Sequence, residues 1–198
     1  PADGFSPPYQ FAIAFAGLLY AILGLWILRT ILRRYFTENI TALTLLLVAL
    51  ATNLVQYSSV ENGMSHTYIF FLYALVLWAV LKWHEKPSFK WAAILGFICG
   101  LAVISRPTEI IIIFIPILWG MHNREASREK WQLVRRHLPH IAVMTAMGII
   151  AILPQIIYWK IVAGTFMHNV GSRWYFLNPW FRVLVGFEKG WFIYTPVT

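Results

Sequence analysis

Long apolar runs constrain this chain more than any other feature of its sequence. They lie at residues 9–32, 40–57, 67–81, 91–119 and 141–162. A helix that crosses a bilayer needs about 20 mostly apolar residues, and most of these runs approach or exceed that length. Only 12% of the residues are charged, whereas about 25% is usual in soluble domains. The sequence therefore predicts an all-α fold, a polytopic transmembrane helical bundle.

The expected bundle has about six to seven membrane segments, which form a single transmembrane domain over residues 1–198. The run at 91–119 counts as two segments because a charged break divides it. The last residues, GWFIYTPVT, open a further apolar segment. Because the chain also starts without Met or a signal peptide, we expect an internal fragment of a longer chain. Gly96 and Gly100 are expected to allow close helix packing.

Basic residues are concentrated in three short loops, at residues 29–34, 82–90 and 124–136. Lys and Arg in short loops mark the cytoplasmic side, so we expect a multi-pass protein of the cytoplasmic (inner) membrane. The formal net charge of +8 then reflects contact with anionic lipid headgroups and not with nucleic acid. Residues 124–136 are expected to form a solvated or headgroup-bound loop. The single cysteine, Cys99, forms no intrachain disulfide, and the sequence carries no metal-binding motif.

The run GLAVISRPTEIIIIFIPILWG, residues 100–120, carries charged residues at its centre. A single long span there would place the basic residues 124–136 outside, against the positive-inside rule. A short hairpin broken at Arg106-Pro107 keeps both flanking basic loops inside. Its legs have about 15 and 11 residues, or roughly 22 and 16 Å, against a hydrocarbon core about 30 Å thick. We therefore expect the hairpin tip in a wet cavity that is reached from the outer face.

Arg106 and Glu109 are the first candidate substrate-binding residues. Pro107 suits the first turn of a helix, so the free N–H groups and the positive dipole end would point into the tip cavity beside the Arg106 guanidinium. Together they predict an anion site, above all for phosphate. Glu109 follows three residues later, on the same side of the helix. The alternative is an internal Arg–Glu pair that only breaks a helix, and the sequence leaves both interpretations open.

A second polar cluster lies in SVENGMSHTY, residues 59–68, at the outer end of two spans. Its carboxylate, imidazole, amide and hydroxyl groups are those of Glu61, Asn62, Ser65 and His66. Such groups can bind a sugar or a phosphate, or transfer a proton. The alternative is an ordinary polar hairpin loop. In the outer loop at 164–190, a short interfacial helix from Asn178 is expected to act as a headgroup anchor or as a lid.

Four segments, in this order, resemble one enzyme superfamily: RRYF, ENGMSHTYIFFLYAL, the run at 100–120 and KGWFIYTPV. Together they look like the middle of a bacterial multi-pass glycosyltransferase of the GT-C superfamily. This superfamily includes protein O-mannosyltransferase-like and lipid A aminoarabinose transferase-like enzymes. The resemblance implies transfer of a sugar from a polyprenyl-phosphate-linked donor to an acceptor, with the working face on the extracytoplasmic side.

The resemblance also implies roles for the candidate residues. Arg106 and the helix end would bind the carrier phosphate and stabilise it as the leaving group. Glu61, Asn62 and His66 would orient the sugar or the acceptor. The acidic catalytic residue of such enzymes belongs to a large outer loop that lacks a clear counterpart here, so no catalytic residue is assigned and the metal requirement is left open. The expected partners are membrane lipids and the lipid-linked sugar donor, and no cofactor is expected.

Two other functions fit part of the pattern. Broken helices with charged midplane residues are typical of secondary transporters, so a transporter with a broken-helix anion site is the first alternative. The sequence shows neither a repeated half nor a second broken segment, and this weighs against a transporter. A non-enzymatic membrane scaffold is the second alternative, and it would need none of the outer polar residues.

Overall fold

The structure is a computed structural model that describes residues 6–61, 63–166 and 184–186. The chain divides into two compact units, residues 1–67 with 168–198 and residues 68–167, and each unit is described by itself. Every element of regular secondary structure in the described residues is a helix. The predicted all-α helical bundle is therefore confirmed for this part of the chain.

The first unit is built from α1 (Pro7–Leu32), α2 (Glu38–Leu50) and the π-helical turn η1 (Gln56–Val60). α1 contacts both of the other elements. Pro7 stands in the first turn of α1, where a missing N–H costs nothing. At the other end of α1, Arg33 forms an ion pair of 2.9 Å with Glu38 of α2.

The predicted span at 40–57 is wrong in its second half, because α2 ends at Leu50. The Thr52 hydroxyl donates a hydrogen bond to the Val48 carbonyl and accepts one from the Leu54 N–H. Such local side-chain bonds compete with the bonds of a continuing helix. The apolar pattern runs on through this break, so hydropathy alone did not reveal it.

The second unit contains most of α3 (His66–Glu85), followed by α4 (Phe89–Ser105), the 3₁₀ helix η2 (Pro107–Ile113), α5 (Phe114–Leu118), α6 (Arg124–Arg136) and α7 (Leu138–Ala163). Its core joins α3, α4 and η2 through buried apolar side chains. They include Leu72, Val76, Ala79, Val80, Leu95, Ile98, Ala102 and Ile112. The two parts of the broken helix, α4 and η2, thus pack together with α3 in one core.

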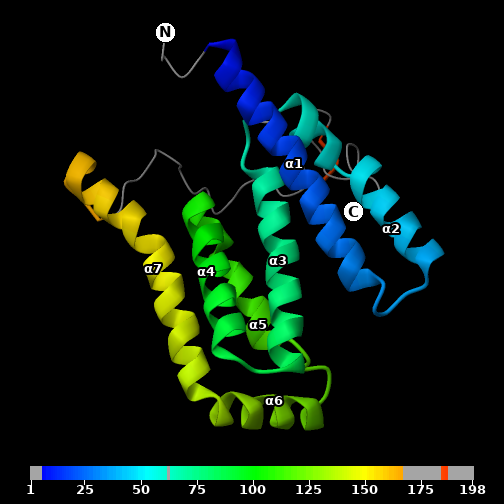
Figure 1. Cartoon of the computed structure of the whole chain (residues 1–198), viewed down its shortest axis with the longest axis vertical. Helices are drawn as coiled ribbons and strands as arrows, with labels where there is room; N and C mark the ends of the chain where they lie inside the picture. The colour runs from blue at the N-terminus through cyan, green and yellow to red at the C-terminus, as the bar shows by residue number, and fades with distance from the viewer. Residues whose placement is uncertain (1–5, 62, 167–183, 187–198) are drawn as a thin grey trace. The chain divides into compact units, whose positions relative to one another are not determined.

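The predicted hairpin is present in the second unit. α4 ends at Ser105, and η2 and α5 return beside it, so the chain arrives at α6 near the end where α4 began (Figure 1). α3 ends and α7 begins at this same end of the unit. The basic segments 82–90 and 124–136 therefore lie at one end, and Arg106 lies at the opposite end. This arrangement agrees with the charge pattern that predicted the hairpin.

Within the described residues, three helices are long and apolar enough to cross a membrane: α1, α3 and α7. Three shorter apolar helical segments accompany them in the described residues, at Glu38–Leu50, Phe89–Ser105 and Pro107–Leu118. This agrees with the prediction of about six to seven membrane segments. The expected C-terminal segment lies outside the described residues.

The prediction of a loop at 124–136 is wrong, because these residues form the helix α6. The Asn123 side chain caps it by accepting a hydrogen bond of 2.7 Å from the Ala126 N–H. Glu125 lies in the first turn and Arg135 and Arg136 in the last, which suits the helix dipole. α6 runs across the basic end of the second unit and is strongly amphipathic (Figure 1). The many charges conceal this helix, because a segment with more charged than apolar residues is typical of a loop.

α4 and α7 approach each other through glycines. A Cβ placed on Gly96 would overlap the Met144 carbonyl of α7, and one on Gly100 would lie 2.6 Å from the Ala151 Cβ. Gly148 of α7 faces Gly96 in turn. Small residues allow helix backbones in a membrane to come this close. The predicted packing role of Gly96 and Gly100 is confirmed.

A buried lysine fastens α6 to its neighbours. The Lys130 ammonium donates a hydrogen bond of 2.8 Å to the Pro116 carbonyl of α5 and another to His84 Nε2 of α3. His84 Nδ1 lies 2.7 Å from the Val80 carbonyl, so Nδ1 carries the proton and Nε2 is free to accept. The Trp83 ring lies below the ammonium, at 6.0 Å. Lys130 is only 8% exposed.

Burial lowers the pKa of Lys130 to about 8 from an ordinary 10.5, and this predicts how stability depends on pH. Below about pH 8 the amine is charged in both states, and the full cost of burying the charge is present. Between about pH 8 and 10.5 the folded state has released a proton that the unfolded state retains, so the thermal unfolding midpoint is expected to rise with pH. Calorimetry in detergent should show this rise in the wild type and a smaller rise in Lys130→Met. Equal slopes in the two proteins would contradict it.

Candidate functional site

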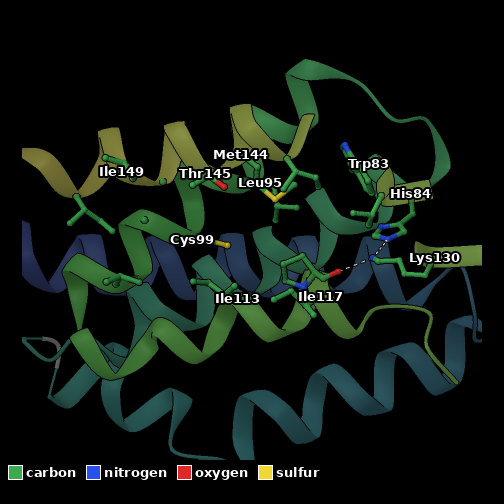
Figure 2. Close-up of a pocket in the computed structure, with 18 of the residues that line it drawn as sticks. Trp83, His84, Leu95, Cys99, Ile113, Ile117, Lys130, Met144, Thr145 and Ile149 are labelled. Atoms are coloured by element: carbon green, nitrogen blue, oxygen red, sulfur yellow. Dashed lines mark hydrogen bonds between the residues drawn. The ribbon is translucent and has the colours of Figure 1, made fainter. Parts of the chain in front are cut away.

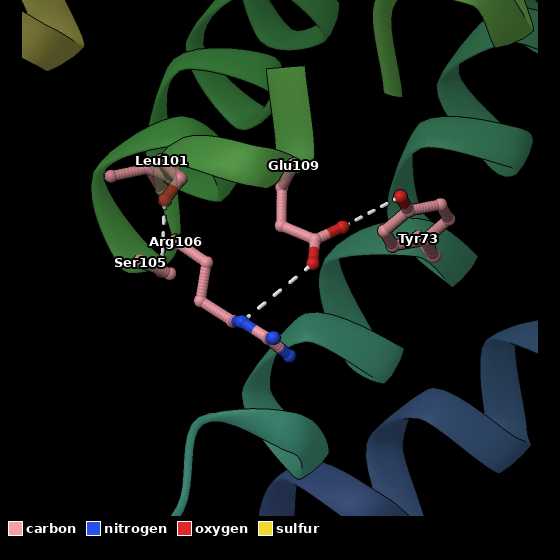
Figure 3. Close-up of polar contacts among 5 residues, drawn as sticks. All are labelled: Tyr73, Leu101, Ser105, Arg106 and Glu109. Carbon is pink, nitrogen blue, oxygen red and sulfur yellow. Dashed lines mark hydrogen bonds and ion pairs between the residues drawn. The ribbon is translucent and has the colours of Figure 1, made fainter. Parts of the chain in front are cut away.

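The break between α4 and η2 has a local cause. Arg106 is extended, with φ −151° and ψ 122°, as expected for the residue that precedes a proline. Its N–H still closes α4 by donating to the Ala102 carbonyl at 3.1 Å. The Ser105 hydroxyl donates back to the Leu101 carbonyl at 2.9 Å (Figure 3). Pro107 then opens η2, so the chain reverses direction with Arg106 at the corner.

Three polar side chains meet at this corner. Arg106 Nε lies 4.0 Å from Glu109 Oε1, and the Tyr73 hydroxyl of α3 donates a hydrogen bond of 2.7 Å to Glu109 Oε2 (Figure 3). The predicted placement of Arg106 and Glu109 on one side is confirmed. We call Tyr73, Arg106 and Glu109 the corner triad. It joins the hairpin to α3 through one carboxylate.

The two charges of the triad differ in exposure. The Glu109 side chain is 13% exposed, whereas that of Arg106 is 42% exposed. A separation of 4.0 Å is an ion pair but too long for a hydrogen bond. The guanidinium has five N–H donors, and this contact at Nε involves only one of them. Glu109 is thus held by Tyr73, whereas the Arg106 side chain is the more exposed partner of the pair.

The expected contribution of the helix end to an anion site is smaller than the sequence suggested. η2 is a 3₁₀ helix of seven residues and not an α-helix. Its first residue is a proline without an N–H, and the Glu109 N–H already donates to the Arg106 carbonyl at 2.9 Å. A short helix with few free N–H groups offers little dipole. The candidate anion site therefore depends mainly on the Arg106 side chain.

Tyr73 is the residue of the triad that sequence reasoning missed. It lies in an apolar stretch of α3, where an aromatic residue is ordinarily interpreted as core or as membrane-facing. The separation of 36 residues from Glu109 leaves no local spacing signal. Only the packing of α3 against η2 brings the two side chains together. Tyr73 is half-buried, and a tyrosine hydroxyl taken out of water needs a hydrogen-bond partner, which is the one hint that the sequence offers.

The second predicted cluster lies in the first unit, around η1. Glu61 ends η1 and accepts a hydrogen bond of 3.4 Å from the Gln56 amide. The His66 ring stacks on Tyr57, with 4.1 Å between ring centres. Ser65 is half-buried, and Asn62 lies outside the described residues. Glu61 and His66 are thus both tied to η1, and π-helical turns of this kind occur often at functional sites.

Two further expectations concern the outer loop at 164–190. Only residues 164–166 and 184–186 of this loop are described, so the interfacial helix expected from Asn178 lies outside the described residues. The described end of the loop begins at Gly164, which has a φ of 71° and closes α7 in the left-handed conformation. The lid or anchor role is therefore still a prediction.

Replacing Tyr73 by phenylalanine should weaken the corner. The Glu109 carboxylate would lose a hydrogen bond, and bonds to charged groups contribute about 1.5–3 kcal/mol. We expect a lower thermal unfolding midpoint and weaker phosphate binding, because the freed carboxylate would draw closer to Arg106. Tyr158→Phe on the exposed face of α7 is the matched control. Equal unfolding midpoints for the two variants would show that the Tyr73 bond contributes nothing.

These features define a class of protein. The features are typical of a multi-pass membrane protein. They are helices long enough to cross a bilayer, a helix broken at an arginine, and a basic amphipathic helix across one end of the second unit. The family follows from a direct match, because residues 7–159 fit the family model for dolichyl-phosphate-mannose-protein mannosyltransferases. The match covers more than half of the chain, which therefore belongs to this family of GT-C membrane glycosyltransferases. No curated protein and no solved structure matches the chain.

Proposed function

We propose that this protein transfers a sugar from a polyprenyl-phosphate-linked donor to an acceptor on the extracytoplasmic face of the cytoplasmic membrane. The family description names a sugar carried on a lipid phosphate, dolichyl-phosphate-mannose, which supports a donor of this class. The charge pattern supports the working face, because Arg106 directly follows the end of α4, which lies opposite to the basic segments of the second unit.

One observation supports the phosphate role: the Arg106 side chain is 42% exposed while its carboxylate partner is held by Tyr73. An arginine fully paired with a carboxylate would have little capacity left for a second anion. Here the loose pair leaves donors that can bind two phosphate oxygens at once.

In the proposed reaction an acceptor atom attacks the anomeric carbon of the sugar. The bond between that carbon and the phosphate oxygen breaks, and the phosphate leaves with an additional negative charge. Arg106 would stabilise this developing charge from a fixed position, which is the type of contact that accelerates transfer most. Glu109 would keep the guanidinium aimed at the phosphate. The proton acceptor is not assigned, and no cofactor is assigned to these residues.

The second set of proposed substrate-binding residues comprises Glu61, Asn62, Ser65 and His66. Their chemistry suits sugar hydroxyl groups, because carboxylates and amides accept and donate hydrogen bonds in the directions that a sugar presents. The proposed role is to orient the sugar or the acceptor. This role is tested separately from the phosphate contact.

Transfer assays on the intact protein in lipid nanodiscs test the second set. Donors with different sugars on a polyprenyl phosphate are compared for wild type, His66→Ala and Met64→Ala, a control in the same loop. We expect His66→Ala to lower kcat/KM by about tenfold or more, which is a typical effect for a group that positions a substrate. Rates equal to wild type with every active donor would contradict the proposed role of His66. A lower unfolding midpoint of His66→Ala would assign the loss to its stacking on Tyr57.

A further inference from the structure

The second unit contains an apolar cavity of about 440 Å³, one end of which lies at Lys130 and His84 (Figure 2). It lies among α4, α5, α6 and α7, and the end of α3 closes one side. Its volume falls in the range of ligand pockets in proteins, about 300–1,000 Å³. The corner triad does not line this cavity. The cavity is therefore distinct from the site proposed for the sugar donor.

The cavity is elongated along the helices. On α4 its lining extends from Leu95 to Val103, and on α7 from Ile141 to Ile152. At 1.5 Å per residue these stretches measure roughly 12 and 16 Å. The glycines of the close α4–α7 contact form part of the wall. An elongated apolar space of this kind suits a hydrocarbon chain.

The cavity is open to its surroundings. Four of its lining side chains are between 40% and 53% exposed: Ile113, Ile117, Trp131 and Ile149. In a membrane protein, exposed aliphatic side chains beside an apolar opening face lipid. A hydrocarbon chain can therefore enter from the side, without crossing the polar end. Trp131 on α6 suits the headgroup level, where tryptophan is enriched.

One end of the cavity is cationic. Lys130 and His84 line it there, and Figure 2 shows the ammonium between His84 and the carbonyl near Ile117. The contacts of Lys130 in the described part of the chain are a neutral imidazole, a carbonyl and an aromatic ring. Its buried charge thus has no carboxylate partner among these residues. Two of the three ammonium hydrogens are used, and one is left for a ligand.

From this combination we infer that the cavity binds an anionic phospholipid, with one acyl chain along the lining stretches of α4 and α7 and the headgroup phosphate at Lys130. The chain buries apolar surface, and the phosphate supplies the negative charge that Lys130 lacks. α6 adds arginines at positions 124, 128, 135 and 136 at the same end. Basic segments of this type attract the anionic lipids of the cytoplasmic leaflet, by about 1 kcal/mol per residue.

The choice of an anionic phospholipid over other occupants follows from position and charge. A zwitterionic lipid could fill the same space, but its choline would meet the basic face of α6. The polyprenyl carrier of the proposed reaction needs the opposite end of the unit, where Arg106 lies. Binding at the cavity is expected to be independent of sugar transfer, so the two can be tested separately.

Native mass spectrometry of the intact protein in neutral detergent tests the inference. The protein is titrated with phosphatidylglycerol, phosphatidylcholine or undecaprenyl phosphate. Two variants accompany the wild type: Lys130→Met, which removes the amine, and Thr145→Trp, which narrows the cavity from α7. Arg128→Met, at an exposed position of the same helix, is the matched control. A photoactivatable acyl chain on phosphatidylglycerol then locates the bound lipid.

The wild type is expected to retain one phosphatidylglycerol in preference to phosphatidylcholine, with crosslinks to α4 and α7. Lys130→Met should weaken phosphatidylglycerol binding about five- to tenfold and abolish the preference, while Arg128→Met has a smaller effect. Thr145→Trp should weaken binding of both phospholipids. Equal retention of the two phospholipids by the wild type, or crosslinks elsewhere, would overturn the inference. Tighter binding of undecaprenyl phosphate that is lost in Lys130→Met would assign the cavity to the carrier and would also overturn it.

Discussion

Replacing Arg106 by alanine is expected to lower sugar transfer by about a hundred- to a thousandfold while the protein still inserts and folds. The expected loss is that of removing one fixed donor from the leaving group in the transition state. The fold should survive because the Arg106 side chain is 42% exposed and its one ion pair is long, at 4.0 Å. Glu109 would keep its hydrogen bond from Tyr73 and would not be left without a partner. The measurement is the initial rate of transfer from a polyprenyl-phosphate sugar in nanodiscs.

Two further variants define what the Arg106 result means. Arg106→Lys keeps the charge but loses the planar fork, so it should restore only part of the activity. Arg128→Ala removes an arginine from the exposed face of α6 and should leave the rate nearly unchanged. If Arg106→Ala transferred sugar at the wild-type rate, the corner triad would have only a structural role at the helix break. A loss of activity in Arg128→Ala of equal size would indicate a general effect of charge.

Replacing Gly96 by alanine is expected to destabilise the second unit by about 3 kcal/mol or more. A Cβ at this position would overlap the backbone carbonyl of Met144, which cannot move as a side chain can. Overpacking commonly costs about 1–3 kcal/mol, and contact with backbone belongs at the upper end of this range or beyond it. For a chain of this length the unfolding midpoint should fall by roughly 6 °C or more. Differential scanning calorimetry in detergent measures this shift.

A graded series of glycine substitutions supplies the controls. Gly148→Ala places a Cβ 3.3 Å from the Gly96 carbonyl, so a small loss of stability is expected. Gly63→Ala meets nothing within 4 Å and should leave the unfolding midpoint unchanged. The order of the three midpoints tests the close approach of α4 and α7. A midpoint for Gly96→Ala equal to that of Gly63→Ala would exclude this contact.

The apolar runs and the charge pattern predicted the helices that cross the membrane, because a bilayer imposes length and polarity on the sequence directly. α1 and α7 match the runs at 9–32 and 141–162 closely. The helix break was predictable at Arg106 because proline restricts the residue before it. The hairpin followed from the positive-inside rule. All of these signals are local in the sequence.

The failures of prediction involve interactions that are not local, or patterns with two interpretations. The charged residues of α6 outnumber its apolar residues, and such a composition favours a loop. The apolar residues are nevertheless spaced so that they share one face of a helix. The end of α2 depends on side-chain bonds of Thr52 that hydropathy does not register. The contacts of Tyr73 and Lys130 depend on which helices pack together. The sequence alone does not show this packing, so it does not predict these contacts. The candidate site was therefore predicted at Arg106 and Glu109, but without Tyr73, which holds Glu109 in place.

Thermal stability under titration with a polyprenyl phosphate tests the proposed donor site most directly. The intact protein in lipid nanodiscs is titrated with undecaprenyl phosphate, as wild type and as Arg106→Ala. A ligand that binds only the folded state raises the unfolding midpoint with its concentration. The proposed phosphate contact predicts a rise in the wild type that is lost in Arg106→Ala. An equal rise in both proteins, or no rise in either, would contradict a donor site at Arg106.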